Sequence, residues 1–193
     1  MRIQPTLLVL PLLLGCAKPA ATTDAGTPTS PHPDLHCPPQ SIPAGKAPPL
    51  GLEVWCHAQA EPGRWLREGP SISWHDNQQR ASEGLFSHGR PTGPWQYWYP
   101  TGQPMEQGSF AGGVKDGVWV SYHADGARSS EGKMIDGKQH GEWSYWSSDG
   151  QSRTVGQWKL GNKDGVWREM NAEDRAVAER LYRDGRLVSQ KDL

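Results

Sequence analysis

The sequence is short of the residues from which most globular cores are built. Hydrophobic residues make up 35% of its 193 residues, and only two of them are phenylalanine. In their place the chain carries ten tryptophans, 23 glycines and 17 prolines. This composition disfavours a helical bundle and favours turn-rich β-structure.

An excess of charge is also absent. The formal net charge is −1, and lysine and arginine are dispersed among acidic residues. A nucleic-acid partner requires a clustered basic face, so we expect none. The seven histidines lack the spacing of metal ligands, and the glycines follow a turn period rather than a phosphate-binding motif. We therefore expect no metal and no cofactor.

The N-terminus reads MRIQPTLLVLPLLLGC, in which the positive Arg2 precedes an apolar run from Leu7 to Leu14. This run is too short to cross a bilayer as a helix. A positive residue, a short apolar run and a small residue are typical of a signal peptide. We assign residues 1–15 to that peptide and exclude them from the fold.

The end of this segment, Leu13-Leu14-Gly15-Cys16, resembles the bacterial lipobox. The resemblance implies that Cys16 is the first residue of the mature chain and carries a lipid, which would hold the protein on a membrane outside the cytoplasm. Ala17 follows where an aspartate would mark retention in the inner membrane, so we favour the outer membrane. The alternative is an ordinary signal peptide with an incidental cysteine.

Residues 16–50 are rich in proline, alanine, threonine and serine and have few aromatic residues. Such a segment buries too little apolar surface to offset the entropy of ordering it. We predict a disordered, lipid-anchored linker, followed by a leader over residues 51–68.

Two further cysteines remain, Cys37 and Cys56. In an exported protein, such a pair is most simply a disulfide, which would contribute about 3 kcal/mol in the chain-entropy model. The alternative is a metal site, because His36 and His57 each neighbour one of the cysteines.

A fixed period of 24 residues organises the rest of the chain. The first glycine of each unit recurs at Gly69, Gly93, Gly117, Gly141 and Gly165. Two residues after the last four of these glycines stand Trp95, Trp119, Trp143 and Trp167. Five residues after all five stand Trp74, Trp98, Tyr122, Trp146 and Met170, and a further bulky position includes Trp158. The repeat units are therefore 69–92, 93–116, 117–140, 141–164 and 165–188, and residues 189–193 form a tail.

Each unit predicts a β-hairpin, because glycine-containing turns separate its two apolar segments. In the third unit these turns are His123-Ala124-Asp125-Gly126 and Asp136-Gly137. A single hairpin is marginally stable in water, so the units must pair with one another. We predict an all-β fold, an elongated single-layer antiparallel sheet of tandem hairpins. For Arg175–Tyr182 in the last unit a helix is the alternative.

The aromatic residues leave one geometric question open. Trp143 and Trp146 are three residues apart, and side chains at that spacing point to opposite faces of a regular strand. Either a bulge intervenes or both faces of the sheet carry aromatic rings.

The segments GQWKLGNKDGVWREM, GSFAGGVKDGVWVSY and GKMIDGKQHGEWSYW share one pattern of glycine and tryptophan. The pattern resembles the MORN repeat, in the bacterial variant of YwqK-type proteins. The segment from Cys37 to Cys56 is similar to the cysteine-paired leader of such lipoproteins. The resemblance covers Gly69 to Val188 and implies a scaffold or binding surface without catalytic residues. It departs at Ser71 and throughout the last unit.

The stretch HGEWSYWSSDG gathers residue types that are common in active sites, namely His140, Glu142 and Asp149. In sister units the position of His140 holds threonine or aspartate, and that of Glu142 holds proline or valine. Positions that vary so freely are typical of solvated turns and strands. We therefore expect no enzyme activity.

The aromatic residues have two interpretations. They stabilise the thin sheet, or some of them bind sugar rings, choline groups or partner side chains. The candidates are Trp74, Trp95, Trp98, Trp119, Tyr122, Trp143, Trp146, Trp158 and Trp167. Two functions follow, a scaffold for an envelope protein partner or a module that binds glycan or cell-wall material. An antitoxin role, which YwqK-type proteins are sometimes assigned, fits poorly with export.

Overall fold

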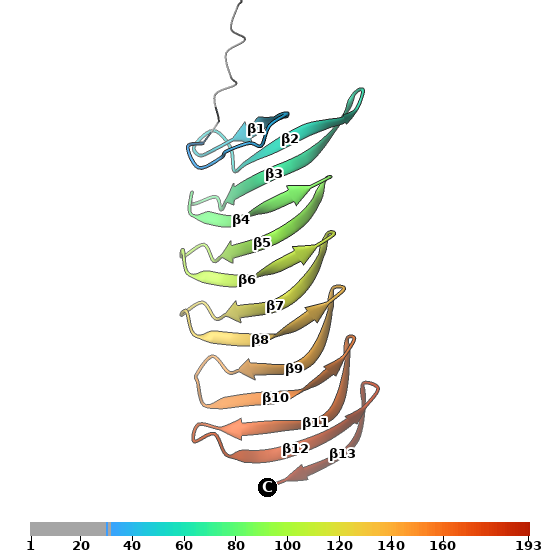
Figure 1. Ribbon diagram of the computed structural model, residues 1–193. Helices are drawn as coiled ribbons and strands as arrows, with labels where there is room; N and C mark the ends of the chain where they lie inside the picture. Colours follow the sequence, from blue (N-terminus) through green and yellow to red (C-terminus); the bar gives the residue numbers. More distant parts are fainter. Residues whose placement is uncertain (1–29, 31) are drawn as a thin grey trace, which may run out of the picture.

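The computed structural model describes residue 30 and residues 32–193, which form one open sheet (Figure 1). The 13 strands lie in chain order, and each pairs antiparallel with the next. The strands are β1 (Ser41–Lys46), β2 (Glu53–Glu61), β3 (Arg64–Trp74), β4 (Arg80–Ser87), β5 (Arg90–Trp98), β6 (Pro104–Ala111), β7 (Val114–Tyr122), β8 (Arg128–Ile135), β9 (Lys138–Trp146), β10 (Ser152–Lys159), β11 (Asn162–Asn171), β12 (Ala176–Arg183) and β13 (Arg186–Asp192). The predicted all-β sheet of hairpins is confirmed. In the described part of the chain, no helix is long and apolar enough to cross a membrane.

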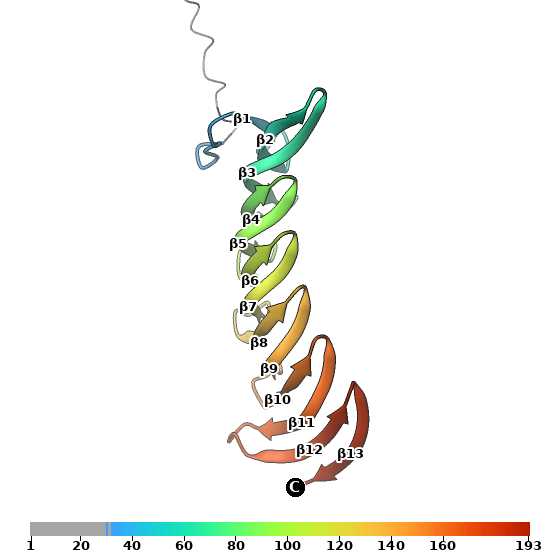
Figure 2. The ribbon, with the colours of Figure 1, turned by 45° about the vertical axis from the view of Figure 1, so that its right-hand side comes forward.

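The sheet is one layer thick along its repeats. Figure 2 shows that the strands bend, so the stack of hairpins is curved across its width. A bulge contributes to this bend. In β9, Trp143 pairs with Gly132 and His140 pairs with Lys133, so Gly141 and Glu142 are extra residues relative to β8. Gly141 has a φ of 73°, and the first glycines of the neighbouring units also have positive φ.

Two kinds of turn connect the strands. At one edge, both residues of the Asp136-Gly137 turn have positive φ, as a two-residue type I′ hairpin requires. At the other edge, the backbone N–H of Gly126 donates to the carbonyl oxygen of His123 at 2.9 Å. The structure confirms both turns that the sequence predicts.

Each hairpin is also fastened to the hairpin before it. At the tight turns, the N–H of Gly137 donates to the carbonyl oxygen of Lys115 at 2.9 Å, and the N–H of Gly161 donates to that of Gln139 at 2.9 Å. At the opposite edge, a ring nitrogen of His75 bonds to the carbonyl oxygen of Trp98 at 2.8 Å. The units are therefore linked at both edges of the sheet.

The pairing of β9 settles the direction of its aromatic rings. Residues 143–146 pair with β10 in unbroken register, so side chains alternate between the faces. Trp143 and Tyr145 lie on one face, here called the ladder face, and Trp146 lies on the other, here called the open face. Both faces of the sheet therefore carry aromatic residues.

The predicted linker over residues 16–50 extends too far. Ser41–Lys46 form β1, and Leu35 is only 2% exposed against Val54 and Ile72. The composition of the segment gives no indication that a single apolar residue, Leu35, holds it against the sheet. Residues 16–29 of the predicted linker, with Cys16, and the predicted signal peptide lie outside the described residues.

The predicted disulfide is confirmed. Cys37 and Cys56 are bonded, with their Cα atoms 5.4 Å apart. The bond fixes residues 32–40 to β2. These residues are here called the leader segment, and they are distinct from the leader predicted over residues 51–68. Because both sulfurs are in the disulfide, neither can be a thiolate ligand, and the alternative of a metal site with His36 and His57 is wrong.

The last unit is a hairpin, as its register predicts. Residues 176–183 form β12, which pairs with β11 and β13, so the helical alternative for Arg175–Tyr182 is wrong. Ala178 is buried at 7% exposure on the ladder face. Pairing with β11 outweighs the helix propensity of these residues.

The tight turn at Leu160-Gly161 contains a residue unsuited to its backbone. Leu160 has a φ of 48° and is 50% exposed, whereas the corresponding position of another turn holds Asp136. A left-handed conformation costs an ordinary residue about 1–2 kcal/mol, and asparagine tolerates it. We predict that Leu160→Asn raises the free energy of unfolding by about 0.5–1 kcal/mol in urea denaturation. The matched variant Asp136→Leu should lower it, and an unchanged midpoint in both would contradict this account.

Candidate functional site

The four repeat tryptophans form a buried ladder on one face of the sheet. Their exposure is 8% for Trp95, 2% for Trp119, 5% for Trp143 and 3% for Trp167. Each indole lies flat on a glycine of the preceding strand, where an added Cβ would be less than 3.0 Å from the ring; the glycines are Gly84, Gly108, Gly132 and Gly156. Glycine at this position therefore makes room for the ring.

Each indole N–H of the ladder also has a partner. It donates to the backbone carbonyl oxygen ten residues earlier, at 3.0 Å for Trp95, Trp119 and Trp143 and at 3.1 Å for Trp167. The acceptor lies beside the glycine under the ring. Burial of the ring thus leaves no indole N–H unsatisfied, and the geometry repeats from unit to unit.

Other side chains cover the remaining surface of the ladder rings. Phe110 meets Trp119 edge to face with centroids 5.1 Å apart, and Trp158 meets Trp167 in the same way at 5.4 Å. The ammonium group of Lys115 lies 3.9 Å from the centroid of the Trp119 ring. These contacts bury rings that a single-layer sheet would otherwise expose.

Two tyrosines, Tyr97 and Tyr145, also stack on the ladder rings. Tyr145 stacks between Trp143 and Trp167, with centroids 5.9 and 6.0 Å away. Its hydroxyl accepts hydrogen bonds from Gln139 at 2.7 Å and from the indole of Trp158 at 2.9 Å. Burial raises the pKa of Tyr145, and burial with the charge of Glu106 raises the pKa of Tyr97. Both phenols are therefore neutral at physiological pH.

The ends of the ladder are closed by residues outside the repeat pattern. In the first unit Ser71 takes the place of the tryptophan, and Trp55 of β2 pairs opposite it. The guanidinium of Arg67 lies 4.8 Å from the Trp55 ring and forms two hydrogen bonds with Glu53, at 2.5 and 2.9 Å. In the last unit Arg180 replaces the glycine opposite Trp167.

The other predicted aromatic residues lie on the open face, near the long turns. Trp74, Trp98, Tyr122 and Trp146 are half-buried. A ring nitrogen of His123 bonds to the backbone carbonyl oxygen of Trp146 at 2.8 Å, and the hydroxyl of Tyr99 donates to the backbone carbonyl oxygen of Tyr122 at 2.8 Å. The structure therefore divides the predicted aromatic set between two faces.

The residues that resemble a catalytic set are not brought together in one site. His140 precedes the bulge in β9 and Glu142 is part of it, whereas Asp149 lies in the turn beyond the strand. Among the described residues, no hydrogen bond joins any two of the three. The pKa of Asp149 is lowered because the hydroxyl of Ser147 and the N–H of Gln151 donate to its carboxylate. These bonds close the turn.

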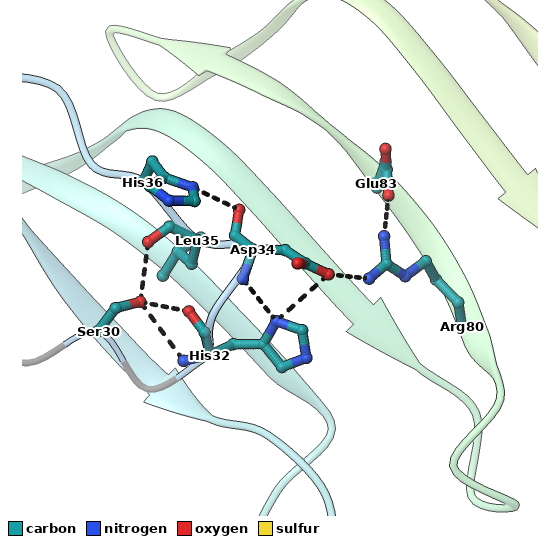
Figure 3. Close-up of polar contacts among 7 residues, drawn as sticks. All are labelled: Ser30, His32, Asp34, Leu35, His36, Arg80 and Glu83. Carbon is teal, nitrogen blue, oxygen red and sulfur yellow. Dashed lines mark hydrogen bonds and ion pairs between the residues drawn. The ribbon is translucent and has the colours of Figure 1, made fainter.

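A shallow depression of about 770 Å³ lies on the open face beside the leader segment. Its apolar lining includes Leu85, Val118 and Val120, and Val118 is 59% exposed. At one end, the guanidinium of Arg80 bonds to Asp34 of the leader at 2.9 Å and also to Glu83 (Figure 3). The depression therefore combines an apolar floor with a charged end.

The sequence interpretation missed these open-face residues. Comparison of units had emphasised the positions that repeat, whereas Val118, Val120 and Arg80 stand at positions that vary. The signal was present in the residue that follows each first glycine, which is valine in two units and glutamate or proline in the others. Alternation places that residue opposite the tryptophan, on the face left free.

Comparison with known proteins bears on one unit directly. No curated protein matches the chain. Among the described residues, no group of three or more histidine, cysteine, aspartate or glutamate side chains is arranged to hold a metal ion. Residues 91–111, which span the hairpin of β5 and β6, match the family model of the MORN repeat variant.

Proposed function

We propose that the chain is a non-enzymatic scaffold of the cell envelope, held on a membrane by a lipid at Cys16, whose open face binds a protein partner. One observation carries the proposal: aliphatic side chains stand exposed on the open face, while the four repeat tryptophans of the ladder are buried on the other face. The exposed fraction is 59% for Val118 and 39% for Leu85. Contiguous exposed apolar surface is typical of sites of protein interaction.

The burial of the ladder favours a protein partner over a glycan. A sugar ring stacks on an exposed aromatic face, but Trp119 and Trp143 are covered by neighbouring side chains and are 2% and 5% exposed. Among the described residues, the tryptophans that offer surface to a glycan are half-buried rings near the long turns, such as Trp98 and Trp146, and Trp65 of β3, which is 47% exposed. Glycan binding is therefore the second candidate function.

The envelope location is supported by two features of the chain. The segment from Leu13 to Cys16 resembles a lipobox. The disulfide between Cys37 and Cys56 is of a kind that persists in oxidising compartments outside the cytoplasm. An antitoxin role, as in the labels of YwqK-type proteins, remains the remote alternative, because an exported chain would not meet a cytoplasmic toxin.

A photocrosslinking experiment in intact cells tests the scaffold function. We predict that benzoylphenylalanine at Val118, on the open face, forms a discrete adduct with one protein. The same group at Leu160 is a matched control, because that residue is 50% exposed but lies in a turn. Purified cell-wall sacculi provide the glycan arm. Equal adducts from both positions, or retention on sacculi without any protein adduct at Val118, would overturn the proposal.

Metabolic labelling with palmitate tests the anchor. We predict that the wild-type chain incorporates the label and fractionates with membranes, and that Cys16→Ser abolishes both, because the thiol is the attachment point. Cys37→Ser serves as the control, since that sulfur is in the disulfide. Persistent labelling of Cys16→Ser would show that the lipid is elsewhere.

A further inference from the structure

The first and third repeat units are more alike than neighbouring units are. Residues 48 positions apart agree in type along both strands and the long turn; the pairs are Ile72 and Val120, Ser73 and Ser121, Trp74 and Tyr122, His75 and His123, Arg80 and Arg128, Ser82 and Ser130, and Glu83 and Glu131. The pairing also agrees, because Glu83 lies opposite Ile72 and Glu131 lies opposite Val120. In the second unit, Pro104 and Gln107 stand at the positions of Arg80 and Glu83.

The leader segment sits on the first of these two units through three contacts. Leu35 packs against Ile72, which is 4% exposed. The ring of His32 lies 5.0 Å from the ring of Trp74. The carboxylate of Asp34 bonds to Arg80 at 2.9 Å, while Arg80 also bonds to Glu83 (Figure 3). Ile72, Trp74 and Arg80 are therefore the leader seat.

The third unit repeats the leader seat, but no segment among the described residues takes the place of the leader there. Val120, Tyr122 and Arg128 stand at the three corresponding positions. Arg128 bonds to Glu131 at 2.5 Å, and Arg80 likewise bonds to Glu83. Among the described residues, no second carboxylate bonds to Arg128. The exposed fraction of its side chain is 57%, compared with 32% for Arg80. We call these three residues the second seat.

The geometry points to the second seat as a docking site for an extended segment of another protein, in which a ring, an aspartate and a leucine are placed as in His32-Pro33-Asp34-Leu35. This inference rests on the proposed scaffold function and names the chemistry of the partner. The carboxylate pairs with the free side of Arg128, the ring packs on Tyr122, and the leucine covers Val120. A separate protein is the occupant, because the leader of each copy is closed onto its own seat by the Cys37–Cys56 disulfide.

Two features set the limits of the second seat. It is continuous with the leader's own interface, since the depression beside the leader is lined by both Asp34 and Val120. On its far side β9 carries Glu142 and Ser144 where β7 carries Val118 and Val120, which ends the apolar floor. Gln107 replaces Val54 opposite the aliphatic residue, so the second seat is less apolar than the first and suits reversible binding.

Fluorescence anisotropy with a labelled peptide tests this assignment. The probe copies residues 32–39, HPDLHCPP, with Cys37→Ser, and is titrated with the full chain in detergent without reductant. We expect saturable binding. The double variant Val120→Ser, Arg128→Ser copies the residues of the fourth unit at the same positions, so it retains a sequence that this sheet already accommodates. It should weaken binding at least tenfold.

Two controls make the outcome specific. Val166→Glu copies Glu142 outside the second seat and should leave binding unchanged. A peptide with Asp34→Asn should bind the wild-type chain at least fivefold more weakly, and the single variant Arg128→Ser should weaken binding of that peptide no further. Absence of binding, or equal binding by the double variant, would overturn the inference. If crosslinking from Val118 nevertheless succeeds, the scaffold function stands. Self-association that requires Arg128 would overturn the choice of a separate protein.

Discussion

The structure depends on one contact, that of a tryptophan ring laid on the backbone of a glycine in the preceding strand. A single-layer sheet has no second layer in which to bury apolar surface. Here each indole buries itself against the sheet that carries it, over Gly132 in the case of Trp143. Burial of about 150–250 Å² per ring corresponds to about 4–6 kcal/mol of gross stabilisation. The rings connect successive hairpins, so the array is stable as a chain of neighbour contacts.

This contact also determines which face of the sheet can vary in amino-acid sequence. On the ladder face, the tryptophan ring needs a glycine beneath it, so neither residue can change alone. Covering residues such as Phe110 and Lys115 differ in type, but each packs on the ring. On the open face, the residue before the tryptophan is proline, valine or glutamate in different units, and no ladder contact constrains it. Binding chemistry can therefore change on the open face without loss of the fold, which is why the second seat lies there.

The parts of the fold that local chemistry determines could be predicted from the sequence. The turn at Asp136-Gly137 and the 24-residue period specify the hairpins directly, and an exported pair of cysteines specifies the disulfide. The position of the leader segment could not be predicted, because it depends on contacts between residues far apart in the sequence. Leu35 packs against Ile72, and Asp34 bonds to Arg80. For the same reason the sequence left the direction of Trp143 and Trp146 open, since only the register with β10 decides it.

A double-mutant cycle on Gly132 and Trp143 tests the central contact most directly. Gly132 lies outside the positive-φ region, so alanine there adds only a methyl group that meets the indole at less than 3.0 Å. We predict that Gly132→Ala lowers the free energy of unfolding by about 2–3 kcal/mol in the wild-type chain. In a Trp143→Leu background it should cost less than about 0.5 kcal/mol, measured by urea denaturation. An equal cost in both backgrounds would contradict the claim that the glycine serves the ring.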